Sequence, residues 1–168
     1  DPEDVAKLTD AQIGVLDNTQ IPGISAAAIA AMTTHQIVQL NTDQIQALTT
    51  AQIKALTTDH IKAIETADLV QMSTKQISAL ETQDVAALTT DQLAVIDTMH
   101  IAKMTAAQIQ AFTTEQIEAL STDQIQALNT AHIQALTTNQ IQAIETADLV
   151  KMSTKQISAL ETQDVAAL

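Results

Sequence analysis

The chain contains 168 residues with a formal net charge of −13, no cysteine and one aromatic residue, Phe112. The absence of cysteine excludes disulfides and thiolate metal sites, while the hydrophobic fraction of 46% is too high for a typical disordered chain. An acidic chain with seven Lys and Arg residues is a poor match for nucleic acid or an anionic membrane surface, so neither is an expected partner. No apolar run is long enough to span a bilayer and no signal-peptide pattern is present, so we expect no membrane insertion and no targeting signal in this fragment.

An eight-residue repeat organises the whole sequence. Division from Asp1 gives twenty-one octads that end at Leu168 without an insertion or deletion. Position five is Ile, Leu or Val in all twenty-one octads, and position eight is Leu, Ile, Met or Phe in all of them. Position one is Thr, Ser, Asp or Asn in seventeen. Such a fixed period indicates a repeat array, so residues 1–168 are predicted to form a single one.

The first three octads, residues 1–24, are degenerate. The opening Asp1-Pro2-Glu3-Asp4 still favours a helix start, since proline suits the first helical position and acidic residues suit the positive helix end. Gly14, Pro22 and Gly23 fall inside expected helices, so these octads are predicted to be the loosest. No polar cap follows Leu168, and we expect the chain to be a fragment of a longer array.

The regular octads occupy residues 25–168. Within them, residues 65–88 recur at 145–168 with one change, Gln71 to Lys151. Duplication of five or ten octads explains this recurrence most simply. A structural reason, in which five octads return the chain to an equivalent environment, is the alternative.

A period of eight excludes a continuous helix. At about 100° per residue, eight residues overshoot two turns by about 80°, so the apolar positions would spiral around the whole cylinder. A strand would place positions five and eight on opposite faces, and Ala and Gln are poor strand formers. The remaining solution is a helix that restarts in every octad.

Residues 49–56, TTAQIKAL, show how each restart is encoded. Thr49 and Gln52 have capping-box spacing, in which the Thr hydroxyl accepts from the Gln N–H and the Gln side chain returns to the Thr N–H. Ile53 and Leu56 then share the inner face. Two such side chains contribute about 3–6 kcal/mol, whereas ordering eight residues costs about 8–16 kcal/mol of backbone entropy. The sequence therefore predicts an all-α solenoid of very short helices, one per octad, with three to five octads per superhelical turn.

The histidines and methionines are interpreted as parts of this scaffold. His60, His100 and His132 replace Gln at position four, and His35 occupies position three, without zinc-ligand spacing. Ser25, Ser73, Ser121 and Ser153 occupy cap positions, and no Ser-His-Asp constellation is found. Methionines at position eight are expected to fill gaps in the core: Met32, Met72, Met104 and Met152. No catalytic residue and no cofactor are predicted.

Four octads combine Glu at position one with Asp at position four. Because Glu is a poor N-cap, the cap is expected to shift to the next residue in these octads, with Asp favoured near the helix start; the shifted caps are Thr66, Thr82, Thr146 and Thr162. The alternative is that superhelical stacking gathers the carboxylates around Ca²⁺. These weak metal candidates are Glu65, Asp68, Glu81, Asp84, Glu145, Asp148, Glu161 and Asp164.

The repeated phrase also carries a resemblance. TTDQIQAL, with TTAQIKAL, STDQIQAL and TTEQIEAL, resembles the Thr-Thr-x-Gln-Ile-x-Ala-Leu octad arrays of very large bacterial surface or secreted proteins, often described as adhesin-like or haem-utilisation-like. The resemblance covers nearly the whole chain, and the sequence departs from the repeated phrase at Gly14, Pro22 and Gly23. It implies an extracellular stalk or spacer in a Gram-negative bacterium and identifies no binding residue or haem ligand.

The expected function is that of a structural module, a stalk, spacer or scaffold between flanking domains of a longer polypeptide. The alternative is a binding module in which positions three and six present a superhelical surface to a peptide, glycan or partner protein. Position six varies widely without a coherent patch, and exposed aromatic anchors are missing from the sequence. The spacer is therefore the preferred hypothesis, and an enzyme is not expected.

Overall fold

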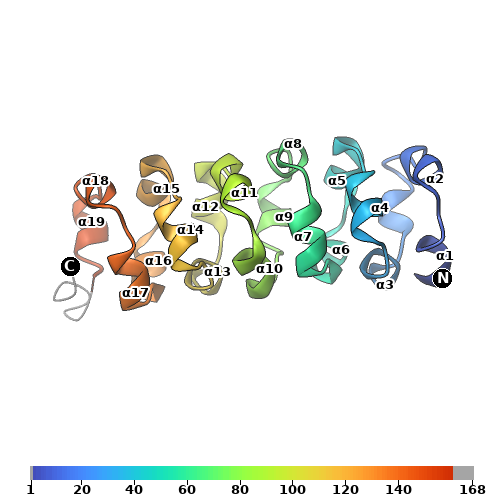
Figure 1. Cartoon of the computed structure of the whole chain (residues 1–168). Coiled ribbons are helices and arrows are strands. Elements are labelled where there is room, and N and C mark those ends of the chain that lie inside the picture. The colour runs from blue at the N-terminus through green and yellow to red at the C-terminus, as the bar shows by residue number, and fades with distance from the viewer. Residues whose placement is uncertain (1, 161–168) are drawn as a thin grey trace. The chain divides into compact units, whose positions relative to one another are not determined.

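Short helices form all of the regular structure in the part of the chain that the structure describes. The computed structural model of the protein describes residues 2–160. Over these residues it has nineteen α-helices, one 3₁₀ helix and no strand (Figure 1). One helix falls in each of the first twenty octads, so the predicted all-α fold with one short helix per octad is confirmed. None of the described helices has both the length and the apolar character needed to cross a membrane.

The chain divides into two compact units, Asp1–Leu88 and Thr89–Leu168, which are described separately. Unit 1 contains α1 (Pro2–Val5), α2 (Asp10–Gly14), η1 (Ile21–Gly23), α3 (Ala26–Ala30), α4 (Thr34–Val38), α5 (Thr42–Ala47), α6 (Thr50–Ala55), α7 (Thr58–Ala63), α8 (Thr66–Leu69), α9 (Thr74–Ile77) and α10 (Thr82–Ala87). Unit 2 contains α11 (Thr90–Val95), α12 (Thr98–Lys103), α13 (Ala106–Gln110), α14 (Thr114–Glu118), α15 (Thr122–Ala127), α16 (Thr130–Ala135), α17 (Thr138–Gln142), α18 (Thr146–Leu149) and α19 (Thr154–Ile157).

The capping residue starts each helix as the sequence predicted. Thr49 has extended backbone angles, φ −72° and ψ 159°, and its hydroxyl accepts a hydrogen bond from the Gln52 N–H. The Gln52 side chain accepts from the Thr49 N–H in return, at 2.7 Å, which completes the capping box. The same reciprocal pair recurs through both units, for example at Ser73 and at Ser121. Each octad that contains this pair therefore satisfies free N–H groups of its own first turn.

Position eight ends the longer helices. Leu56 turns back to extended angles, φ −60° and ψ 145°, although its N–H still donates to the Ile53 carbonyl. The next residue, Thr57, is already the cap of the following helix. A single extended step, from position eight to position one, thus separates one helix from the next.

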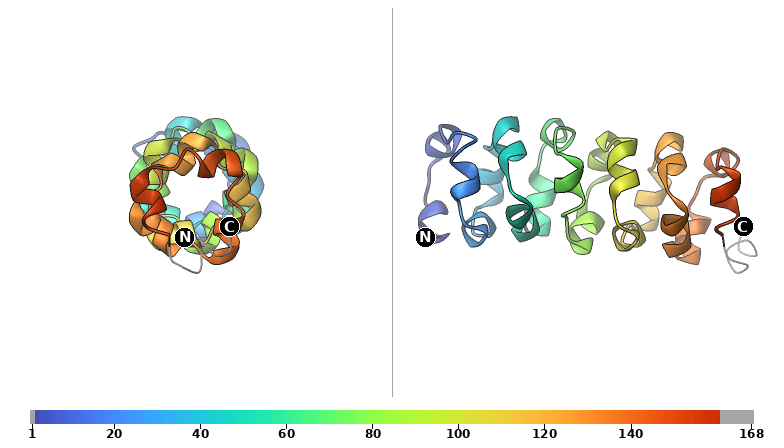
Figure 2. Two further views of the ribbon diagram at one scale, coloured as in Figure 1. Left: turned by 90° about the vertical axis from the view of Figure 1, so that its left-hand side faces the viewer. Right: turned by 180° about the vertical axis from the view of Figure 1, so that it is seen from behind.

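Within each unit, a helix packs against the helix three octads away. In unit 1, α6 contacts α3 and α9, and α7 contacts α4 and α10. In unit 2, α16 contacts α13 and α19. Successive helices in each unit accordingly wind around a common axis, as the end-on view in Figure 2 allows the reader to follow. The packing of helices three octads apart indicates about one superhelical turn every three octads, which lies within the predicted range of three to five.

Positions five and eight form the core in both units. Ile53 is 0% exposed and Leu56 is 4% exposed. Position five is buried from Ile13 to Ile141, and the methionines at position eight are buried as predicted: Met32, Met72, Met104 and Met152. The core therefore consists of two aliphatic residues per octad, repeated along the winding.

The third octad keeps its cap but loses its α-helix. Asp17 takes the cap position, where its Oδ1 accepts from the Thr19 N–H at 2.8 Å and the Gln20 N–H at 2.9 Å. The Thr19 hydroxyl also donates to Oδ1, and this bond, followed by those of the two N–H groups, lowers the pKa of the Asp17 carboxyl. Pro22 lies inside the 3₁₀ helix η1, whose three residues replace the expected α-helical turns. The relative looseness of the first three octads stays a prediction.

Candidate functional site at the joint between octads

In many octads, the residue at position four joins its octad to the fourth octad before it. The Gln52 side chain is 1% exposed and uses both ends of its carboxamide. Its Oε1 accepts from the Thr49 N–H, while its Nε2 donates to the carbonyl oxygens of Ile21 and Ile24, both at 2.7 Å. One buried side chain therefore caps its own helix and satisfies two backbone acceptors on another turn of the superhelix.

The same hydrogen bonds repeat in both units, and we call them the position-four ladder. In every described case the Gln Nε2 donates to the position-eight carbonyl 28 residues earlier, and in most cases also to the position-five carbonyl 31 residues earlier. The ladder donors within unit 1 are Gln36, Gln44, Gln52 and Gln76. Those within unit 2 are Gln124, Gln140 and Gln156.

The ladder refines the geometry of the winding. Helices touch at a separation of three octads, whereas the ladder bonds span four. Each unit thus winds with between three and four octads per turn, inside the predicted range of three to five. The sequence prediction had assigned position four only to the cap and missed its second contact.

Histidine reproduces the two contacts of glutamine. Nδ1 of His60 accepts from the Thr57 N–H at 3.3 Å, and Nε2 lies 2.8 Å from the carbonyl oxygen of Met32. Because a carbonyl can only accept, Nε2 carries the proton and the ring is in its neutral Nε2–H tautomer. His132 makes the equivalent contacts, to the Asn129 N–H and the Met104 carbonyl. The interpretation of these two histidines as substitutes for Gln is supported.

Each of the other two histidines lies close to an aspartate side chain. His100 is 6% exposed, and its Nδ1 lies 2.9 Å from Oδ1 of the capping Asp97. His35 is exposed, and its Nε2 lies 3.0 Å from Oδ2 of Asp10, a residue three octads earlier. An exposed pair of this kind contributes little to stability. The four histidines lie in separate octads and do not gather.

A pH effect is expected at His132. Burial lowers its pKa from the ordinary value of 6.5, although the hydrogen bond to Met104 acts in the opposite direction. The folded chain therefore binds fewer protons here than the unfolded chain, and this octad loses stability as the pH falls through 6.5. We expect His132→Gln to leave the melting temperature nearly unchanged at pH 7.5 and to raise it relative to the parent at pH 5. His35→Gln, at an exposed histidine, is the control; an equal gain in both variants would contradict the assignment to His132.

Glutamate does not shift the cap, which corrects one sequence prediction. Glu65, Glu81 and Glu145 are themselves the N-cap residues, with extended backbone angles and no side-chain capping bond. Thr66, Thr82 and Thr146 are the first helical residues instead. The backbone break is fixed by the position-eight to position-one step, so the octad register determines the cap even where the side chain is a poor one. Thr162 lies outside the described residues.

The aspartates at position four have two different environments. Asp68 accepts a hydrogen bond from the Thr42 hydroxyl at 2.6 Å, and Asp148 accepts one from the Thr122 hydroxyl. Both hydroxyls come from position two of the octad three before. Asp84 is 0% exposed, and neither of its carboxylate oxygens has a hydrogen-bond partner. Burial, and to a smaller extent the negative charge of Glu81, raises the pKa of the Asp84 carboxyl, while the backbone N–H of Glu81 acts in the opposite direction.

These carboxylates are not brought together into a metal centre. Across residues 2–160, no group of three or more His, Cys, Asp or Glu side chains has an arrangement that could hold a metal ion. The winding instead places Asp68 and Asp148 beside Thr hydroxyls and leaves Glu65 and Glu145 at the surface. The candidates Glu161 and Asp164 lie outside the described part of the chain.

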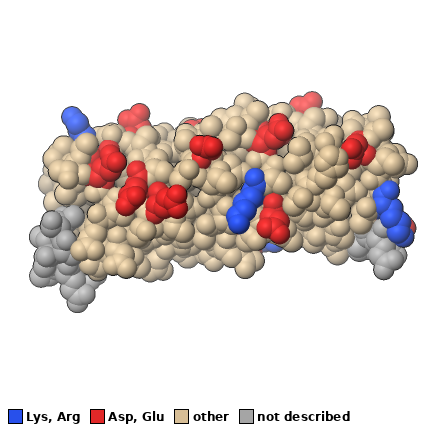
Figure 3. Space-filling view, in the orientation of Figure 1, with Lys and Arg blue, Asp and Glu red and all other residues tan. Residues whose placement is uncertain are grey.

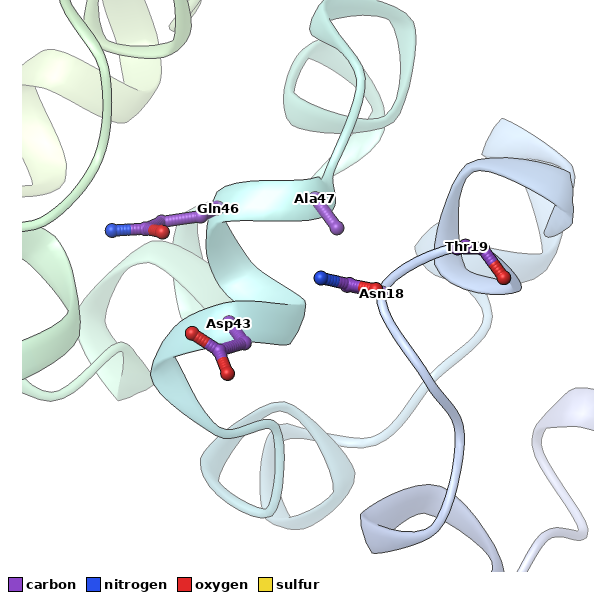
Figure 4. Close-up of a pocket in the computed structure, with 5 residues that line it drawn as sticks. All are labelled: Asn18, Thr19, Asp43, Gln46 and Ala47. Carbon is purple, nitrogen blue, oxygen red and sulfur yellow. The ribbon is translucent and has the colours of Figure 1, made fainter.

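Shallow grooves run on the outer surface between helices three octads apart. In unit 1, Figure 4 shows Asn18 pointing toward α5 across a hollow of about 380 Å³ that Asp43, Gln46 and Ala47 also line. In unit 2, a hollow of about 520 Å³ separates α12 from α15, lined by Thr98, Met99, Ala102, Asp123, Gln126 and Ala127. Positions two, three and six therefore form the exposed surface, as the sequence predicted for positions three and six.

Charge on the visible face is acidic and dispersed. Figure 3 shows Asp and Glu side chains spread over this face among mostly uncharged residues, with few Lys side chains. Some large apolar side chains are also exposed, but they are isolated at single positions, for example Val15, Met99 and Val150. Isolated apolar residues of this kind are normal on soluble surfaces and indicate no particular partner.

Comparison with known proteins agrees with this arrangement. A family model described as the ALTTAQ repeat matches residues 24–58, 61–98, 93–130 and 141–168. The matched residues begin at the end of the degenerate octads and cover most of the regular ones. No curated protein sequence matches the chain. The match extends over most of the chain, and the chain therefore belongs to the ALTTAQ repeat family.

Proposed function

We propose that this repeat module acts as a spacer or stalk between other domains of a large bacterial surface or secreted protein. The observation that carries the proposal is the position-four ladder, because it joins octads by the same contacts wherever it is described. A surface specialised for one ligand would depend on a few particular octads. A spacer needs only that each octad continues the winding of the octads before it.

The chemistry of the octads is consistent with a structural role without catalysis. Most of the polar side chains in the interior are used for capping and for the ladder, as Gln52 and His60 illustrate. The outer positions carry Thr, Gln and dispersed acidic residues that favour solubility. The proposed location outside the cell follows from the resemblance to octad arrays of bacterial surface and secreted proteins.

Deletion of one octad tests the spacer directly. Removing residues 49–56 keeps every remaining octad in register, so each position-four donor again faces an octad four places earlier. We expect the maximum dimension measured by small-angle X-ray scattering to decrease, while the helical signal per residue in circular dichroism is preserved.

The matched control is a deletion of half an octad, residues 49–52. It removes fewer residues but shifts the register by four, so the ladder cannot reform across the deletion. We expect a lower melting temperature and a lower helical signal than for the eight-residue deletion. If the two deletions were equally tolerated, the octad would not be the unit of length, and the spacer proposal would be wrong.

The outer grooves support a second candidate, a binding module. The groove between α12 and α15 is the specific observation, since it combines the exposed Met99 with Asp123 in a hollow of about 520 Å³. A peptide or glycan bound there would contact positions two, three, six and seven. Met99→Lys would weaken such binding and leave the spacer dimensions unchanged, so the two functions are experimentally separable.

A further inference from the structure

Asp84 interrupts the position-four ladder within unit 1. In the register of the other position-four residues, a donor at position 84 would face the carbonyl oxygens of Leu56, 28 residues earlier, and Ile53, 31 residues earlier. Among the described residues, no group donates a hydrogen bond to the Leu56 carbonyl, whereas the Ile53 carbonyl accepts from the Leu56 N–H at 3.2 Å. Both oxygens of Asp84 are also without a partner, and the side chain is 0% exposed. The Asp84 carboxylate and the Leu56 carbonyl are therefore two acceptors at one joint, and neither receives a hydrogen bond from the described residues.

This arrangement is unfavourable with an ionised carboxylate. An anion is costly to bury unless it is paired or accepts hydrogen bonds, and opposing acceptors repel each other. A protonated carboxyl removes both problems, because it has one O–H donor and one carbonyl acceptor. It then resembles the carboxamide of Gln, which has the same two functions in the neighbouring octads.

We propose that Asp84 is a proton-binding site whose O–H, when protonated, donates to the Leu56 carbonyl and completes the ladder at octad 81–88. The bound proton comes from solvent and is released to solvent when the joint opens. Octad 81–88 is then more stable at acidic pH than at neutral pH. The proposal concerns one joint in unit 1 and does not depend on what the array separates.

Among residues 2–160, no charged side chain makes a hydrogen bond to Asp84. α7 packs against α10 and carries Asp59 and Lys62, which are exposed, and His60, whose Nε2 donates to Met32. The other titratable groups nearby in the chain or the register are all exposed, namely Glu81 of the same octad, Lys75 of α9 and Lys54 of α6. Thr58, the counterpart of Thr42 and Thr122, makes no hydrogen bond to Asp84. A proton is the smallest group that can complete this joint.

The sign of the pH effect follows from the raised pKa of Asp84, which results chiefly from burial. The folded chain keeps this proton to a higher pH than the unfolded chain, whose carboxyl has the ordinary pKa of 3.8. Stability at this site is therefore greatest below 3.8 and is lost as the pH rises through the raised value, above which the loss is complete.

Asp84→Gln tests the proposal in the full chain, because it supplies the donor permanently. We expect this variant to melt several degrees higher than the parent at pH 8, and the difference to shrink steadily as the pH is lowered to 4.5. The midpoint of the ¹³C chemical shift of the Asp84 carboxyl, measured by NMR, is expected above 3.8. Asp68→Asn is the matched control, since Asp68 occupies the same position but accepts from Thr42; its difference from the parent is not expected to grow with pH in this way.

Three outcomes would overturn the proposal. The first is a difference between Asp84→Gln and the parent that does not change with pH. The second is an Asp84 carboxyl midpoint at or below the ordinary value. The third is a rise in the melting temperature of the parent protein at pH 8 to that of Asp84→Gln when Ca²⁺, Na⁺ or K⁺ is added. The joint would then hold a cation and not a proton.

Discussion

The double substitution Ile53→Asp and Leu56→Asp is expected to unfold the octads around α6. It removes the two core residues of one octad, each of which contributes about 1.5–3 kcal/mol when buried. It also places two carboxylates where the side chains are 0% and 4% exposed. A combined loss above about 4 kcal/mol is expected for such buried charges.

Hydrogen exchange measured by mass spectrometry would locate the damage. We expect peptides from α3, α6 and α9 to lose protection first, because α6 packs against both of the other helices. The control is Lys54→Asp, which changes the exposed residue between the two core positions. Protection in α6 equal to that of the parent after the double substitution would show that this octad does not depend on its core pair.

Gln52→Glu separates the ladder from the cap. Glutamate has nearly the shape of glutamine and suits the reciprocal position of a capping box, so a role in capping alone predicts little change. The ladder predicts a large loss, since an anionic oxygen would replace the Nε2 group that donates to the Ile21 and Ile24 carbonyls at 2.7 Å. We expect the free energy of unfolding to fall by about 3–5 kcal/mol at neutral pH.

Gln12→Glu is the matched control for this prediction. Gln12 forms the same capping box with Thr9, at 2.9 Å from the Thr9 N–H, but its side chain is exposed. We expect a change within about 0.5 kcal/mol there. Urea unfolding at pH 7.5 measures both variants, and equal effects of the two substitutions would remove the ladder as a source of stability.

The local structure of one octad was predictable because its causes are local. Thr49, Gln52, Ile53 and Leu56 lie within eight residues, so the cap, the core pair and the impossibility of a continuous helix all follow from short-range chemistry. The number of octads per turn does not, because it depends on how helices three apart pack. For the same reason the second contact of Gln52, to residues 28 and 31 positions away, was not predicted.

One signal in the sequence does point to that second contact. Position four of the twenty-one octads is never Glu, although Glu would serve a capping box as well as Gln. Gln, which is found there most often, and His have both an acceptor and a donor, although Asp occupies position four in five octads. The prediction of a shifted cap at Glu65 is wrong because the winding imposes a helix boundary at Glu65. The Glu side chain alone would not favour that boundary.

The four-octad span of the ladder gives assembly a threshold. In a polypeptide α-helix, the first hydrogen bond requires several residues to be fixed before any bond is gained, which makes nucleation slow and growth fast. In this array, octads are added as residues are added to an α-helix. An array of four octads can form no ladder bond, and the fifth octad forms the first one, as Gln36 does with the Leu8 carbonyl. Short arrays should therefore be coil-like, and each octad added beyond the fifth should stabilise the fold by a nearly constant amount.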